Sequence, residues 1–142
     1  MISGYTIKRD QTTQALRAEV QSGARAEFKL HAAIVDLLSA TRLPGVVFWH
    51  TPNGARRKPA EAAALKAMGL LAGVADLCIS IPGAKFCFME VKASHGRLSD
   101  EQEAFLAGME RNGHRTAVVR DLGEAMAFLR DWGAIRAVRV AA

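Results

Sequence analysis

Residues 73–92 read GVADLCISIPGAKFCFMEVK, and this stretch decides the fold. Two runs rich in β-branched and aromatic residues, 75–81 and 85–92, predict two strands. The residues between them, Pro-Gly-Ala at 82–84, predict a tight hairpin loop. The stretch is therefore an antiparallel strand pair whose register follows from its short loop.

That register places three charged side chains on one face of the hairpin. If Ile81 pairs with Lys85, opposed residue numbers sum to 166, and Asp76 lies directly across from Glu90. Directly opposed residues have Cβ atoms about 4.5–5.5 Å apart and point to the same face. The two-residue period of a strand puts Lys92 on that face too, about 6.6 Å beyond Glu90. Two carboxylates this close repel each other unless a cation lies between them, so they predict a site for Mg²⁺ or Mn²⁺.

The opposite face of the hairpin is apolar and is expected to join the core. Because Cys78 and Cys87 fall on different faces, we expect no disulfide between them. A β-bulge would shift the whole pairing by one residue. The apolar face carries Leu77, Ile79, Ile81, Cys87, Met89 and Val91.

The rest of the chain alternates between helical and strand patterns, which predicts an α/β fold with a central mixed sheet flanked by helices. Gly23 is taken to separate a polar N-terminal extension, residues 1–23, from a single domain over residues 24–142. Residues 134–140 are consistent with a final strand. We predict helices over residues 12–20, 24–41, 59–68, 99–111 and 122–132, and further strands over residues 46–50 and 114–120.

Composition narrows the class of protein. The chain has 142 residues, of which 50% are hydrophobic, so it is long enough and apolar enough for one folded domain. Its 19 Lys+Arg against 14 Asp+Glu give a net charge of +5, which favours an acidic partner such as nucleic acid. No stretch reaches the roughly 20 apolar residues that cross a bilayer, and residues 1–22 lack a signal-peptide core, so no membrane contact is expected. A reducing cytoplasm is the expected setting.

Several of these residues also have purely structural explanations. An E-x-K triplet on a strand is commonly two solvated charges. Glu27 continues the apolar stripe of a helix and would need a partner such as a metal site, but an acid is also favoured in the first turn of a helix. Gln102 fits the third position of a capping box with Ser99 as N-cap. The histidines lack a metal-binding spacing and are taken as structural or surface residues, with His95 nearest the site: His31, His50, His95 and His114.

In order along the chain, residues 73–76 (GVAD), 89–92 (MEVK) and 96–102 (GRLSDEQ) resemble the VRR-NUC branch of the PD-(D/E)XK nucleases. Glu27 in a helix and the Pro-Asn-Gly turn at 52–54 also match, and the resemblance spans residues 24–132. One departure is Ala75, which stands where the family has proline. The resemblance implies a restriction-endonuclease-like core and a VRR-NUC-like nuclease domain over residues 24–142.

The resemblance also implies roles for individual residues. The metal ligands would be Asp76, Glu90 and the carbonyl of Val91, with Glu27 holding the ion directly or through water. Lys92 would be the catalytic lysine, and Gln102 would line the site. The cofactor would be Mg²⁺ or Mn²⁺, with no organic cofactor.

The family further implies metal-dependent hydrolysis of DNA, on branched DNA such as four-way (Holliday) junctions, by a homodimer in the cytoplasm of a bacterium or a phage-infected cell. The alternatives are a flap or nicking nuclease of the same fold, a non-catalytic basic DNA-binding module, and a soluble α/β protein whose positive charge is incidental. The expected DNA-backbone contacts are Asn53, Arg56, Arg57, Lys58 and Arg97, although basic residues in a loop are often simply solvated.

Overall fold

The computed structural model describes residues 5–52, 57–83 and 86–137. In these ranges no helix is both long and apolar enough to cross a membrane. The elements are, in chain order, α1 (Tyr5–Thr41), β1 (Val47–His50), α2 (Pro59–Ala67), β2 (Leu77–Ser80), β3 (Cys87–Val91), α3 (Asp100–Arg111), β4 (Arg115–Val119) and α4 (Leu122–Asp131).

The four strands form one mixed sheet in the order β1-β2-β3-β4, which confirms the predicted fold class. β1 and β2 are antiparallel, β2 and β3 are antiparallel, and β3 and β4 are parallel. Leu77 lies opposite Met89 and Ile79 lies opposite Cys87, so the predicted hairpin register is correct across the paired strands. The turn pairing itself involves Lys85, which lies outside the described residues.

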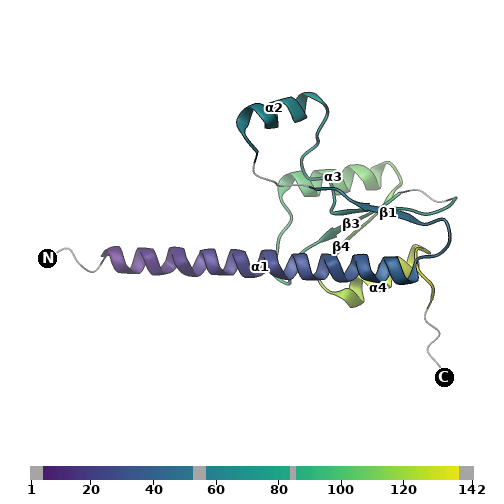
Figure 1. Cartoon of the computed structure of the whole chain (residues 1–142), viewed down its shortest axis with the longest axis horizontal. Coiled ribbons are helices and arrows are strands. Elements are labelled where there is room, and N and C mark those ends of the chain that lie inside the picture. The colour runs from purple at the N-terminus through teal and green to yellow at the C-terminus, as the bar shows by residue number, and fades with distance from the viewer. Residues whose placement is uncertain (1–4, 53–56, 84–85, 138–142) are drawn as a thin grey trace, which may run out of the picture.

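The core lies on the face of the sheet that the hairpin pattern predicted. Figure 1 shows α1 and α4 on one side of the sheet and α3 on the other. The fully buried Ile34 and Leu38 of α1 pack there with Leu129 of α4. On the other face, the ring of Phe88 meets that of Phe105 of α3 at 5.3 Å between centroids. All six predicted core residues of the hairpin are buried: Leu77, Ile79, Ile81, Cys87, Met89 and Val91.

The predicted break at Gly23 is wrong, because α1 is one helix of 37 residues. The Cβ position of Gly23 lies 4.0 Å from the Cβ of Ala93, just beyond β3. That is an ordinary contact distance, so the glycine does not end the helix but continues it, at a cost of about 1 kcal/mol relative to alanine. The helix continues well beyond the sheet toward the N-terminus (Figure 1). The division into domains at residue 23 stays a prediction.

The predicted final strand over residues 134–140 is also wrong for the described part of it. Ile135 forms only an isolated antiparallel bridge with Arg42, and residues 138–142 lie outside the described ranges. The edge of the sheet is already formed by β4, so this segment instead joins the core: Ala134 and Ile135 are buried beside α1 and α4.

Gly73 lies at the approach to β2 and lets the first turn of α3 come close. Its φ of 82° is in the left-handed region, and a Cβ there would overlap the backbone carbonyl of Glu101. Because Gln102 follows directly, this contact sets the height of α3 above the sheet. Gly69 has a similar φ of 93°, but its Cβ position meets nothing within 4 Å.

A comparison of alanine substitutions at Gly69 and Gly73 distinguishes the cost of backbone strain from that of steric overlap. We expect Gly73→Ala to lower the free energy of unfolding by about 1–3 kcal/mol more than Gly69→Ala, because both carry the φ penalty but only the first forces backbone apart. Denaturant unfolding followed by circular dichroism measures both variants. Equal destabilisation would show that α3 is free to shift at this contact.

Candidate active site

A cavity of about 390 Å³ lies between the hairpin, α1 and the start of α3. Its walls include every side chain that the sequence assigned to the centre of the site, although these residues come from four separate segments. The structure thus brings together Glu27, Asp76, Glu90, Lys92 and Gln102.

Glu90 is the most enclosed group of the site, with 2% of its surface exposed. Its Oε1 accepts a hydrogen bond of 2.6 Å from Gln102 Nε2 and lies 3.2 Å from Lys92 Nζ. Its Oε2 is buried and has no hydrogen-bond partner within the described residues. Burial and, to a lesser degree, the charge of Asp76 raise the pKa of Glu90 to about 7, although Lys92 acts in the opposite direction.

Asp76 lies one residue before β2 and ties three segments together. Its Oδ2 accepts a hydrogen bond of 2.8 Å from the backbone N–H of Val91, so its carboxylate reaches over to β3. Its own carbonyl accepts from the N–H of Thr51 at 3.0 Å and from His50 Nδ1 at 2.8 Å. These contacts hold the carboxylate beside Glu90, as the register predicted. The role of the Val91 carbonyl as a metal ligand stays a prediction.

Glu27 reaches the site from the middle of α1. Because α1 begins at Tyr5, the alternative explanation of Glu27 as a first-turn acid is wrong. Its Oε1 accepts a hydrogen bond of 3.1 Å from the N–H of Ala93, immediately after Lys92. Glu27 therefore anchors the segment that carries the lysine.

Gln102 has both of the roles that the sequence left open. It is the third residue of α3 in a capping box, in which its N–H donates to Ser99 Oγ at 3.2 Å and its Oε1 accepts from the Ser99 N–H at 2.9 Å. Its Nε2 remains for Glu90. One amide thus fixes the start of the helix with its oxygen and orients a carboxylate with its nitrogen.

The predicted DNA contacts are placed only in part. Arg97 and Lys58 are exposed and Arg57 is half-buried, and none of these three lines the cavity. Lys58 is the N-cap residue of α2, none of whose residues is buried. Asn53 and Arg56 lie outside the described residues.

Two histidines beside Asp76 were not assigned to the site from the sequence. The rings of His31, on α1, and His50, at the end of β1, meet edge to face with centroids 4.6 Å apart. Burial lowers the pKa of His31, and His50 lowers it further, whereas Asp76 raises it. A signal was available, because His31 follows Glu27 by four residues and so shares its helix face. His95 is exposed and lines a different cavity, to which Glu27 also contributes.

An aspartate before one strand and E-x-K on its antiparallel neighbour, with a helical glutamate behind them, match the motif of the PD-(D/E)XK nucleases. A family model of the VRR-NUC domain matches residues 11–121, so the chain belongs to the VRR-NUC domain family. It is accordingly a nuclease domain, and nucleases are hydrolases that act on nucleic acid.

Solved structures agree with this assignment at the level of the fold. One described as a "VRR_NUC domain protein" has a TM-score of 0.61 and 18% identity, over 73% of this chain and 84% of that one. Another, described as a "VRR_NUC domain", has a TM-score of 0.53 and 15% identity, over 75% of this chain and 97% of that one. The comparison with curated proteins found no match.

The buried charge of Glu90 predicts a stability that depends on pH when metal is removed. With a pKa raised to about 7 from 4.5, folded Glu90 keeps a proton that the unfolded chain releases, so its ionisation destabilises the fold as pH rises from 4.5 through 7. We therefore expect Glu90→Gln to raise the melting temperature in EDTA at pH 8 and to change it little at pH 5.

Calorimetric melting at the two pH values measures this difference. Glu103→Gln is the matched control, because Glu103 is an exposed acid on α3 and should show no such pH-dependent gain. A Glu90→Gln variant no more stable than the wild type at pH 8 would mean that the carboxylate is not under strain.

Proposed function

We propose that this chain is a metal-dependent DNA endonuclease that uses Mg²⁺ or Mn²⁺ to hydrolyse phosphodiester bonds. The observation that carries this proposal is the buried Oε2 of Glu90, which has no hydrogen-bond partner in the described part of the chain and shares a cavity with Asp76. A buried carboxylate next to a second carboxylate is costly unless it is paired or binds metal. A divalent cation held by Asp76 and Glu90 would remove that cost.

The donor atoms suit a hard cation. Asp76, Glu90 and Glu27 offer carboxylate oxygens, and oxygen ligands are those that Mg²⁺ and Mn²⁺ prefer. Glu90 Oε1 is already engaged by Gln102 and Lys92, which leaves Oε2 for the ion. When bound, such an ion activates a water molecule and neutralises charge on the scissile phosphate.

The protein groups around the two acids would stabilise the reacting phosphate and hold the carboxylates in place. Lys92 is 9% exposed and its ammonium lies 3.2 Å from Glu90 Oε1, so it is held beside the acids that a phosphate would approach. There it donates hydrogen bonds to the phosphate and stabilises the negative charge that develops during attack. Gln102 fixes the Glu90 carboxylate, and the Val91 N–H fixes that of Asp76. All are set before substrate arrives, so little reorganisation is needed.

Branched DNA, such as a four-way junction, is the substrate that we propose, cut by a two-fold pair of chains. The basic residues contact backbone phosphate, which positions DNA without reading its sequence. Support for a second copy comes from α1, which extends past the sheet (Figure 1) and on which Leu16 and Val20 are exposed one turn apart. A two-fold pair would present two sites to a symmetric junction.

Lys92→Ala tests the catalytic assignment. We expect cleavage to fall by at least about a hundredfold while DNA binding is largely kept, because the lysine acts on the transition-state charge. The assay offers four-way junction, flap, splayed-arm and linear duplex DNA with Mg²⁺, Mn²⁺ or EDTA. Lys29→Ala, an exposed lysine of α1 away from the cavity, is the matched control.

The outcomes separate the alternatives. Metal-dependent cutting of the junction that Lys92→Ala abolishes supports the full proposal. Cutting of flaps or nicks alone keeps the nuclease and rejects the junction. Salt-sensitive binding without cutting of any DNA points to a non-catalytic binding module.

Arg97→Ala and Lys58→Ala test the DNA-backbone contacts. Each lost phosphate contact should reduce the slope of log affinity against log salt by about 1, for every DNA sequence tested alike. Fluorescence anisotropy over a salt series measures this slope. If neither substitution changes the slope, these residues are simply solvated and DNA lies on another surface.

A further inference from the structure

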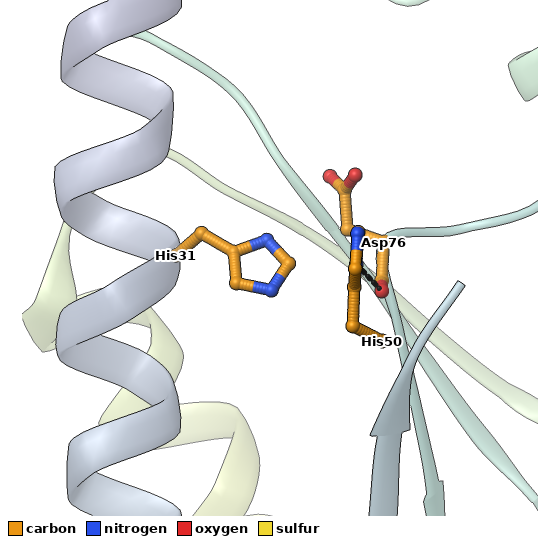
Figure 2. A group of neighbouring side chains, drawn as sticks. All are labelled: His31, His50 and Asp76. Atoms are coloured by element: carbon orange, nitrogen blue, oxygen red, sulfur yellow. Dashed lines mark hydrogen bonds between the residues drawn. The ribbon is translucent and has the colours of Figure 1, made fainter. Parts of the chain in front are cut away.

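We infer that His31, His50 and Asp76 form a second cation site, suited to a transition-metal ion that accepts imidazole nitrogen. One donor atom from each residue lies within 4.8 Å of the others. Figure 2 shows the His31 ring extending from α1 toward the segment that carries Asp76 and toward His50. These residues come from three separate segments of the chain, and none belongs to the E-x-K triplet.

His50 is prepared for metal binding by its hydrogen bond. Its Nδ1 lies 2.8 Å from the carbonyl of Asp76, and because a carbonyl only accepts, Nδ1 carries the proton (Figure 2). The other ring nitrogen then keeps its lone pair. Metal-ligating histidines almost always donate their second nitrogen in this way, since the bond fixes both tautomer and ring orientation.

His31 is positioned by the packing of α1. It is half-buried and stands edge to face with His50, three residues before the core residue Ile34. A cavity of about 310 Å³ opens at this pair and is also lined by Asp76 and Glu27. Those two acids line the first cavity as well, so the proposed site adjoins the Asp76–Glu90 pair.

The donor set decides which ions fit. Two imidazoles and one carboxylate suit Zn²⁺, Mn²⁺, Fe²⁺ or Co²⁺, whereas Mg²⁺ prefers oxygen. Ligand atoms that share one ion lie about 3–3.5 Å apart at bonds of about 2.1 Å. Closing this cluster therefore takes side-chain shifts of about 1 Å, shared among the three residues.

The histidine site predicts that the chain binds different numbers of Co²⁺ and Mg²⁺ ions, which the proposed nuclease site alone does not predict. A chain with only the Asp76–Glu90 site binds Mg²⁺ and Co²⁺ in the same number. With the histidine site it binds one more Co²⁺ than Mg²⁺. Nitrogen ligation also intensifies and shifts the visible absorption of Co²⁺, which gives a readout independent of cleavage.

The experiment titrates the full chain, free of any affinity tag, with CoCl₂ or MgCl₂ by calorimetry, and follows Co²⁺ by absorption. We expect His31→Gln and His50→Gln each to weaken the additional Co²⁺ binding by about tenfold or more. Glu90→Gln should keep it. His95→Gln is the matched control, an exposed histidine outside the cluster.

Identical Co²⁺ stoichiometry and spectra in His31→Gln, His50→Gln and His95→Gln would overturn the inference, as would equal numbers of Co²⁺ and Mg²⁺ bound to the wild type. Melting curves in EDTA establish that each variant is folded. The titration contains no DNA, so its outcome does not depend on cleavage. A chain that binds the additional Co²⁺ here but cuts no DNA in the cleavage assay would support this site and reject the nuclease.

Discussion

The structure depends on the pairing of β2 with β3 and on the bond from the Val91 N–H to the Asp76 carboxylate. Side chains alternate along a strand, so one register places both acids and Phe88 on the face of α3, and Leu77, Ile79 and Met89 on the face that packs against α1 and α4. A slip of one residue would turn Glu90 into the core and Met89 to the face that α3 covers. The same pairing that gives the domain its core therefore also sets the two acids side by side.

The remaining contacts of the site compensate for that arrangement. Like charges at short range, one of them almost fully buried, oppose folding. Lys92 offsets part of the repulsion, and Gln102 satisfies one oxygen of Glu90. The other oxygen is left unmet by the described protein groups. The fold tolerates this because the opposite face of the same strands is closely packed, so stability comes from one face and reactivity from the other.

The sequence was informative where the determinants are local. A three-residue loop and a two-residue period were enough for the hairpin register, and with it the neighbourhood of Asp76, Glu90 and Lys92. Glycine has a low helix propensity, so Gly23 predicted a break that the continuous α1 does not have. The sequence also failed where distant segments meet. The His31–His50 contact joins a helix to the end of a strand, and the sequence separation of the two histidines does not predict that they meet.

Because α1 is one continuous helix, the number of residues between positions 14 and 26 fixes how the N-terminal part of α1 is oriented relative to the site. Each residue of a helix turns the next by about 100°, so inserting or deleting one residue between positions 14 and 26 would rotate the whole preceding part of α1 about its axis relative to the site. Substitutions on the exposed face leave that phase unchanged. Homologues should therefore differ freely in residue identity along this segment while keeping the same number of residues. A length change by whole helical turns would also restore the orientation of the N-terminal part of α1.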